Sequence, residues 1–343
     1  MKTYIYRLRF KAPVHFGTTG IGLENTLERL SSDSLTSALI NAFSIMGGAD
    51  EAISALTAKS PSFLLSSLFP YGPPENGSGT AYALPRPLSK PPVADQEIVR
   101  GFGKDLKHIR YLTPGDFAAW IGRHSLSSEQ VEAMIKRSQQ LGRFSSRDSG
   151  IGWWALELRP RVALDRVSQN SNIWHCGALH FEKDAGLYGL VRMSDESWKN
   201  DLSSAFNLLG DLGLGGERTY GMGAFDFGGF EPLDQAWTSV SEMDSNQFVL
   251  LSNFFPADDE RNLLVDSLIA YDFRETRGYV VSGRMATTLK RKRIRMIAEG
   301  SVLKMPLRGK MVDVTPDRSE AFGVGHPVFR SGLAFILPEG GAL

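Results

Sequence analysis

A glycine-rich stretch at residues 212–225 constrains this chain more than any other segment. It reads Leu-Gly-Leu-Gly-Gly-Glu-Arg-Thr-Tyr-Gly-Met-Gly-Ala-Phe and contains five glycines. Because glycine lacks a Cβ, such a segment can adopt positive φ angles, leave backbone N–H groups accessible and curl round an anion. Arg218 adds a planar cation and Tyr220 adds a ring, which are the side chains best suited to hold a phosphate and a base. The combination favours RNA binding through shape and backbone.

Two nucleotide-binding motifs do not fit this stretch. A P-loop requires a Lys-Ser or Lys-Thr pair after its glycines, and residues 212–225 contain neither pair. A Rossmann fingerprint lies between a strand and its helix, whereas this stretch follows a predicted helix and precedes a predicted strand. A tight turn packed against a sheet remains the alternative, and the arginine and tyrosine favour RNA binding over it.

The charge balance restricts how RNA is bound. The chain has 343 residues, enough for two domains, and carries 38 basic and 38 acidic side chains, so its formal net charge is zero. A protein that binds RNA alone by bulk attraction usually carries a basic excess. Any basic surface must therefore be local, which suits a subunit that contacts both RNA and protein.

Cysteine and histidine usage excludes several classes of site. Cys176 is the single cysteine, so an internal disulfide and a zinc site built on paired cysteines are excluded. None of the six histidines is spaced as a metal ligand on a helix. The chain has no signal-peptide pattern and no apolar run near the roughly 20 residues that span a bilayer. We expect a cytoplasmic protein with no metal, no cofactor and no membrane contact.

The pattern outside residues 60–150 predicts one β-α-β-β-α-β unit. Apolar and mainly basic residues alternate along the first strand, residues 4–11, and Ser32, Asp33 and Ser34 offer caps for a helix that ends near Met46. Later strands are predicted at residues 155–166, 174–181, 187–193 and 224–227, with the last two separated by a helix that carries Trp198, Leu202, Phe206 and Leu209. This order is the ferredoxin-like arrangement that RRM domains share.

Residues 60–150 are predicted to be an insertion. Proline-rich segments at 69–74 and 84–92 indicate an excursion from the core without regular secondary structure, apart from a helix at about 128–141. Lys104, Lys107 and Arg110 form a basic cluster in it. Either a solvated surface edge or an RNA-contacting finger explains this cluster.

The chain is thus predicted to be an α+β protein with two ferredoxin-like (RRM-like) domains. The first covers residues 1–229 with its insertion, residues 230–246 form a polar linker, and residues 247–343 form a degenerate second ferredoxin-like domain. A cluster of five cations at 290–293 and 295 is either a solvated turn or a contact for an RNA backbone or an acidic partner.

Several of these elements, taken in order, resemble the RAMP proteins of CRISPR effector complexes. They are the basic first strand, Val14–Gly17, Ser32–Ile40, Arg159–Arg166, the glycine loop Gly213–Gly223 and Gly325–Gly332. The serine block and the C-terminal His-Pro-Val segment are most similar to the subunit of the type III-A (Csm) complex that holds the 5′ end of the crRNA. The resemblance covers nearly the whole chain.

The resemblance implies a non-catalytic subunit that grips the crRNA 5′ handle. It would bridge a large polymerase-like signature subunit to the backbone RAMP subunits, and a thumb hairpin from the insertion would lie near the target RNA. An alternative is a metal-independent crRNA-processing endoribonuclease, in which His15 acts as general base on a 2′-OH.

The resemblance also assigns site residues. The positions expected to contact RNA are His15, Ser32, Ser34, Arg159, Arg161, Arg166, Gly215, Gly216, Arg218, Tyr220 and Gly221. Ser32 and Ser34 would provide a phosphate seat at a helix N-terminus. Lys104, Lys107 and Arg110 would lie on the thumb.

Overall fold

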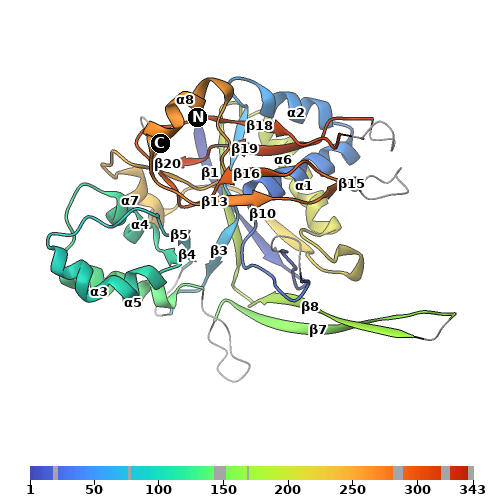
Figure 1. Cartoon of the computed structure of the whole chain (residues 1–343), viewed down its shortest axis with the longest axis horizontal. Coiled ribbons are helices and arrows are strands. Elements are labelled where there is room, and N and C mark those ends of the chain that lie inside the picture. The colour runs from blue at the N-terminus through green and yellow to red at the C-terminus, as the bar shows by residue number, and fades with distance from the viewer. Residues whose placement is uncertain are drawn as a thin grey trace.

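A central antiparallel sheet organises the molecule, a computed structural model (Figure 1). The structure describes residues 1–17, 22–75, 79–142, 152–167, 170–280, 289–317 and 325–338. Strand β1 (Lys2–Phe10) pairs with β10 (Phe225–Pro232) on one side and β9 (Gly186–Met193) on the other. Beyond β9 lie β2 (Phe63–Leu65) and β3 (Phe69–Gly72), and β3 also pairs with β4 (Ala81–Tyr82).

The two faces of this sheet bury two different cores. Helices α1 (Ser32–Met46) and α6 (Trp198–Leu212) cover the face that carries Tyr6 and Leu8, where Leu35 and Phe206 are fully buried. The opposite face carries Ile5 and packs against helical residues between positions 106 and 135 and against the C-terminal strands. Alternation along β1 therefore serves both cores, and both predicted elements, the strand and the helix ending at Met46, are confirmed.

The basic side chains of β1 do not form the free cationic face that the alternation suggests. Arg7 pairs with Glu231, and Arg9 and Lys11 both pair with Asp226 on the neighbouring strand β10. Cross-strand acids thus neutralise this end of the sheet.

Residues 60–150 contain regular secondary structure that their proline-rich composition does not predict. Strands β2 and β3 belong to the central sheet, so the prediction that the chain leaves the core at residue 60 is wrong. Further on, α3 (Gln96–His108), α4 (Pro114–Ile121) and α5 (Ser128–Gln140) form a helical group, with β5 (Leu84–Pro85) paired to β6 (Tyr111–Leu112). The predicted helix near 128–141 is confirmed, and Ser127 caps its N-terminus in a capping box.

The projecting element is a long hairpin outside residues 60–150. Strands β7 (Trp154–Leu164) and β8 (Ser171–Phe181) pair along their whole length and extend away from the body (Figure 1). This hairpin lies outside residues 60–150, where the thumb hairpin was expected, and the strands predicted at 174–181 and 187–193 do not pair with each other. The first of those strands pairs with β7 and the second with β1, because the polar turn at 182–185 redirects the chain.

The C-terminal half packs directly on the first. Its four-stranded sheet runs β12 (Leu268–Ala270), β17 (Val302–Leu303), β11 (Phe248–Leu250) and β20 (Ile336–Leu337). Three hairpin pairs join β13 (Phe273–Thr276) to β16 (Ile294–Ile297), β14 (Tyr279–Val280) to β15 (Leu289–Lys290), and β18 (Gly309–Asp313) to β19 (Phe329–Leu333). The helices α2 (Ala49–Thr57), α7 (Thr238–Ser241) and α8 (Arg261–Ser267) complete the fold.

Residues 230–246 are not a loose linker. Trp237 and Val240 are buried in the same core as Ile5, and α7 packs against α4. The predicted α+β class with antiparallel sheets is confirmed. The division into two ferredoxin-like domains at the stated boundaries stays a prediction.

Candidate nucleic-acid interface

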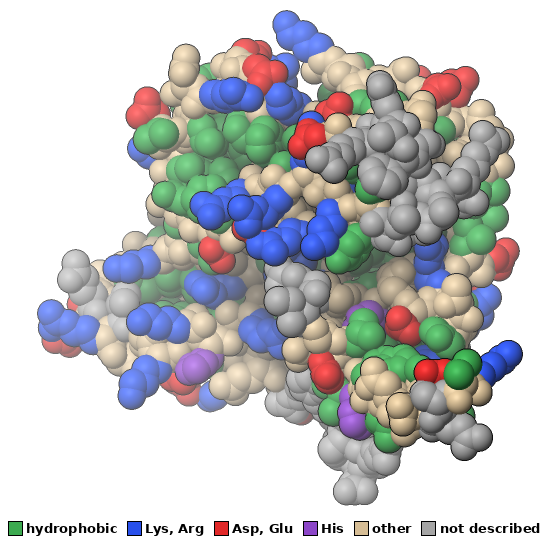
Figure 2. All heavy atoms as spheres, turned by 45° about the vertical axis from the view of Figure 1, so that its right-hand side comes forward, with side chains coloured by type: hydrophobic (Ala, Val, Ile, Leu, Met, Phe, Trp, Pro, Cys, Tyr) green, Lys and Arg blue, Asp and Glu red, His purple; other side chains and the backbone are tan. Residues whose placement is uncertain are grey.

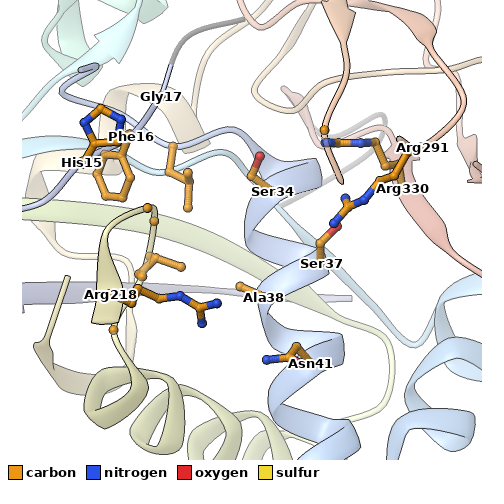
Figure 3. A pocket seen from close by; sticks show the side chains of 16 residues that line it. His15, Phe16, Gly17, Ser34, Ser37, Ala38, Asn41, Arg218, Arg291 and Arg330 are labelled. Carbon is orange, nitrogen blue, oxygen red and sulfur yellow. The ribbon is translucent and has the colours of Figure 1, made fainter. Parts of the chain in front are cut away.

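A cleft of about 600 Å³ brings together segments from both halves of the chain (Figure 3). One wall is the glycine loop with His15, the floor is one face of α1, and the other wall carries Arg291 and Arg330. In Figure 3, Arg218 reaches toward Ala38 from the first wall, while Arg330 reaches toward Ser37 from the second. No Asp or Glu belongs to the cleft lining in the part of the chain that the structure describes.

The glycine loop is shaped by close backbone contacts. Gly213, Gly215, Gly221 and Gly223 all have positive φ, as the glycine-rich sequence predicts. A Cβ on Gly223 would lie 2.2 Å from the carbonyl oxygen of Leu214, and one on Gly215 would lie 2.6 Å from that of His15. These glycines allow the loop to fold back on itself and onto the end of the first strand. Gly221 has open space around it and does not line the cleft.

His15 is a buried part of the first wall. Its Nδ1 lies 2.8 Å from the carbonyl oxygen of Gly177 on β8, and because a carbonyl only accepts, Nδ1 carries the proton and donates. The backbone oxygen of His15 accepts a 2.8 Å hydrogen bond from Gly216. His15 therefore joins the hairpin, the end of the first strand and the glycine loop.

Helix α1 supplies a floor of small and polar side chains. Ser34, Ser37, Ala38 and Asn41 recur at helical spacing on the face that the two walls leave open. Ser34, one of the predicted RNA contacts, lies on this floor. The prediction for Ser32 is wrong, because Ser32 is 1% exposed and its Oγ accepts a 3.0 Å hydrogen bond from the backbone N–H of Asn253.

The second wall is built on a buried ion pair. Arg330 on β19 donates through Nη1 to Asp33 of α1, and their side chains are 7% and 0% exposed. The other terminal nitrogen of Arg330 donates to the backbone oxygen of Arg277 at 2.7 Å. Asp33 also accepts a 2.9 Å hydrogen bond from Asn253. This network holds β19 against the first turn of α1 and fixes the Arg330 guanidinium beside the cleft.

Arg291 gives the second wall an uncompensated charge. Its Nε donates to the Tyr279 carbonyl at 3.0 Å, which orients the guanidinium, and it forms no ion pair with any described residue. Burial, followed by the nearby Arg330 cation, lowers the pKa of Arg291. The guanidinium keeps its charge at neutral pH, and an anion in the cleft would stabilise that charge.

The predicted arginines of β7 and β8 lie outside the cleft lining. Arg161 stacks its guanidinium over the Tyr220 ring, with 4.1 Å between the guanidinium carbon and the ring centroid. Arg159 pairs with Glu157 on its own strand, and Arg166 is exposed near the hairpin turn. Arg161 and Tyr220 thus connect the projecting hairpin to the outside of the glycine loop, and Tyr220 remains 61% exposed.

The predicted thumb residues lie on the helical group. Lys104 and Lys107 are exposed on α3 and form no ion pair with a described residue, whereas Arg110 follows the helix and pairs with Glu28. None of the three lines the cleft, so the structure separates them from the other predicted contacts.

Four cleft residues escaped the sequence interpretation: Ser37, Asn41, Arg291 and Arg330. Arg291 lies within the five-cation cluster at 290–293 and 295, for which a solvated turn and an RNA or acidic-partner contact were both open. Arg330 lies in the C-terminal segment that carries the family resemblance. The three cleft arginines, the bare loop and the polar helix face can bind a phosphodiester backbone.

The described residues hold no group of three or more His, Cys, Asp or Glu side chains arranged for a metal ion. Across the same residues, none of the helices combines the length and the apolar character that crossing a bilayer requires.

Comparison with known proteins gives the class of protein. Residues 243–338 match the family model of the CRISPR Csm4 C-terminal domain. The chain is 29% identical over 346 residues to the CRISPR system protein Csm4 of Mycobacterium tuberculosis (strain CDC 1551 / Oshkosh), with both chains covered completely. It is 27% identical over 320 residues to Csm4 of Thermococcus onnurineus (strain NA1), covering 90% of this chain and 92% of that one.

Two solved structures share the fold. One is a Csm3–Csm4 subcomplex of the type III-A CRISPR-Cas interference complex, with a TM-score of 0.57, 19% identity and 99% of each chain covered. The other is a Csm1–Csm4 cassette in complex with pppApA, with a TM-score of 0.55, 21% identity and coverage of 98% and 97%.

Together these findings confirm the predicted resemblance to a protein subunit of type III-A CRISPR complexes. The chain is similar along its entire length to the Csm4 protein of Mycobacterium tuberculosis.

Proposed function

We propose that this chain is the RNA-binding, non-catalytic subunit that anchors the crRNA 5′ handle in a type III-A effector complex, and that the cleft is the anchoring site. The observation that carries the proposal is the charge of the cleft. Three arginines and no described carboxylate line it, in a protein whose net charge is zero. Local concentration of positive charge in a concave site is what a bound polyanion requires.

The two walls suit different parts of a single strand. The glycine loop permits close approach of a ribose-phosphate backbone, and Arg218 offers a free guanidinium beside it. Arg291, held beside the Asp33–Arg330 pair, offers a second cationic position across the α1 floor. A strand that runs from one wall to the other would place successive phosphates at these two positions, with its bases splayed outward for recognition.

The projecting hairpin is the candidate for the thumb that the resemblance assigned to the insertion. We propose that β7 and β8 form the thumb and extend toward the target RNA, since their paired strands reach beyond the body (Figure 1). Arg161, stacked on Tyr220, then links the thumb to the anchored handle. For the first half, the sheet order β10-β1-β9-β3 with two helices on one face supports the ferredoxin-like proposal.

The partners of the related structures extend to this chain as a proposal. Csm4 is bound to Csm1 in one structure and to Csm3 in another. We therefore expect this chain to contact a large signature subunit and a backbone RAMP subunit, which agrees with its balanced charge.

The rival function is RNA cleavage by His15. His15 lines the cleft, but cleavage at a 2′-OH also needs a second group that donates a proton to the leaving oxygen. Besides His15, the described lining residues with polar side-chain atoms are three arginines, two serines and one asparagine. Arginines stay protonated at neutral pH and do not serve as proton donors. This composition supports a binding site over a catalytic one.

The test compares RNA retention in complexes purified with matched variants. Arg218→Ala with Arg291→Ala is expected to reduce crRNA retention and expose the 5′ handle to nuclease footprinting. The control, Lys59→Ala with Arg123→Ala, removes two exposed cations elsewhere and is expected to change neither. An unchanged footprint in the cleft variant would contradict the proposal. Specific cleavage of repeat RNA in EDTA, abolished by His15→Ala, would favour the rival.

A further inference from the structure

The tip of the glycine loop has a second side, which the cleft does not use. Arg218, Thr219 and Tyr220 form one turn of 3₁₀ helix, in which successive side chains are about 120° apart. Arg218 lines the cleft, whereas Tyr220 lies outside the lining and meets the guanidinium of Arg161 on β7. One turn therefore presents a cation to the cleft and an aromatic ring to the hairpin.

Unusual backbone geometry holds this turn in place. Glu217, which precedes it, has a φ of 56° and is the single non-glycine residue with positive φ in the part of the chain that the structure describes. The backbone N–H of Tyr220 donates to the carbonyl oxygen of Glu217 at 2.9 Å and closes the turn. Backbone strain of this kind gathers at ligand-binding positions, and here it fixes where the Tyr220 side chain leaves the loop.

One face of the Tyr220 ring is open to a ligand. The Arg161 guanidinium lies 4.1 Å from the ring centroid and covers the other face, yet Tyr220 remains 61% exposed. In Figure 2 the hairpin comes forward at the lower right with hydrophobic side chains uncovered on its surface. Leu158, Val162 and Ile173 of the hairpin are each more than half exposed. A planar group can therefore reach the junction of hairpin and loop and stack on Tyr220.

A carboxylate lies on the same side of the loop. Burial, followed by the nearby Glu217 carboxylate, raises the pKa of the Cys176 thiol on β8, which puts Glu217 on the hairpin side. Glu157 is engaged with Arg159 and His180 at the base of the hairpin. Glu217 belongs to no ion pair among the described residues, so its oxygens are available to accept hydrogen bonds.

We propose that one nucleobase of the bound RNA stacks on the open face of Tyr220 and donates a hydrogen bond from its exocyclic amino group to Glu217. Adenine, cytosine and guanine each carry such a group, whereas uracil has carbonyl oxygens instead, which a carboxylate repels. The loop therefore selects against uracil at one position of the strand. The inference rests on the proposed function, since the strand that supplies the base is the one anchored in the cleft.

The spacing of the two loop side chains suits a single nucleotide. Cα atoms two positions apart are separated by no more than about 7 Å. A nucleotide whose phosphate contacts Arg218 can thus place its base against Tyr220 when that base is turned outward. The cleft then holds the backbone, and the outer side of the loop reads the base.

The test measures binding of the full chain to synthetic single-stranded RNA with the repeat-derived 5′ sequence of its crRNA. Each base in turn is replaced by an abasic ribose. At one position the loss of the base is expected to weaken binding to the unaltered chain about tenfold, and to change nothing in Tyr220→Ala. Tyr220→Phe keeps the ring and should behave as the unaltered chain does. Tyr271→Ala removes a tyrosine of similar exposure, 50%, from the C-terminal half and is the control.

Base selection is tested with Glu217→Gln, which keeps the side-chain size and adds an N–H donor. Uracil at the sensitive position is expected to weaken binding to the unaltered chain about tenfold and binding to Glu217→Gln no more than about twofold. Arg218→Ala should weaken binding of every abasic RNA alike, because it removes a phosphate contact and leaves the base contact in place.

Two results would overturn the inference and leave the anchoring proposal intact. In one, no abasic position distinguishes Tyr220→Ala from the unaltered chain. In the other, uracil at the sensitive position has the same effect on Glu217→Gln and on the unaltered chain. An unaltered chain that binds none of these RNAs would contradict the proposed function as well. Thermal unfolding of each variant separates a binding defect from a folding defect.

Discussion

The two walls of the cleft are built in different ways. The first is a contiguous loop whose shape depends on the backbone, with glycines where a Cβ would meet a carbonyl oxygen. The second depends on side chains, and its key pair joins Asp33 to Arg330, 297 positions apart in the chain. A loop of the first kind can be predicted from its local glycine pattern. A buried pair of the second kind forms only when the two halves of the chain pack together, so no local pattern predicts it.

The largest expected effect concerns the buried pair. Arg330→Met is expected to lower the free energy of unfolding by about 3–5 kcal/mol, because it leaves Asp33 charged and buried without its cation. Urea unfolding monitored by tryptophan fluorescence measures the loss. Asp33→Asn added to Arg330→Met removes the stranded charge and is expected to restore much of that stability. Equal stability of the single and double variants would show that Arg330 contributes through packing alone.

The first wall predicts a contrast between two glycines with similar positive φ. Gly223→Ala is expected to cost about 3 kcal/mol, because left-handed backbone strain is combined with a Cβ 2.2 Å from the Leu214 oxygen. Gly221→Ala meets nothing within 4 Å and is expected to cost about 1 kcal/mol from the backbone strain alone. Chemical unfolding gives both values, and equal losses would mean that the loop does not depend on close backbone approach. RNA binding should follow the same order.

The free arginines separate RNA affinity from stability. Arg218→Ala is expected to leave stability unchanged, since Arg218 is exposed and unpaired among described residues. Arg291→Ala is expected to maintain or raise stability, because burial and Arg330 already lower the pKa of Arg291 and so oppose its charge in the folded state. Each variant should reduce handle-RNA affinity by about tenfold, through loss of a charge-assisted contact, and the slope of log K against log salt by about 0.7.

A titration of RNA binding across salt concentrations, with thermal unfolding in parallel, checks both arginines. Loss of stability in Arg291→Ala would show that this residue has a structural partner in the folded chain. An unchanged salt slope would remove it from the RNA contact.

Sequence patterns predicted the elements whose signals are local. Alternation identified β1, helical spacing identified α1 to its last residue, and glycine density identified the curled loop. The same reasoning failed for β2 and β3, because a short strand that contains Pro70 has the composition of a loop although it pairs in the central sheet. Pairing partners depend on tertiary packing, so local patterns did not identify β7 as the partner of β8.

The candidate site shows the same division. His15, Ser34, Gly215, Gly216 and Arg218 were predicted and do line the cleft. Ser32 was predicted from its place in the first turn of α1. In the structure its backbone N–H donates to Ser67 and its hydroxyl accepts from Asn253, so both groups are engaged in buried hydrogen bonds. Arg291 and Arg330 reach the cleft only because β15 and β19 pack beside α1, and no local pattern records that contact.

The smallest expected effect lies where the hairpin meets the first wall. Arg161→Ala and Tyr220→Ala are each expected to reduce stability by about 0.5–1 kcal/mol, the contribution of an exposed cation–π contact. If the two side chains act only through each other, the double variant loses no more than either single one, so a double-mutant cycle by thermal unfolding isolates their coupling. Tyr220→Phe keeps the ring and is the control. Strict additivity would separate the hairpin from the glycine loop energetically, and the first wall would then hold its shape through glycine contacts and His15 without support from β7.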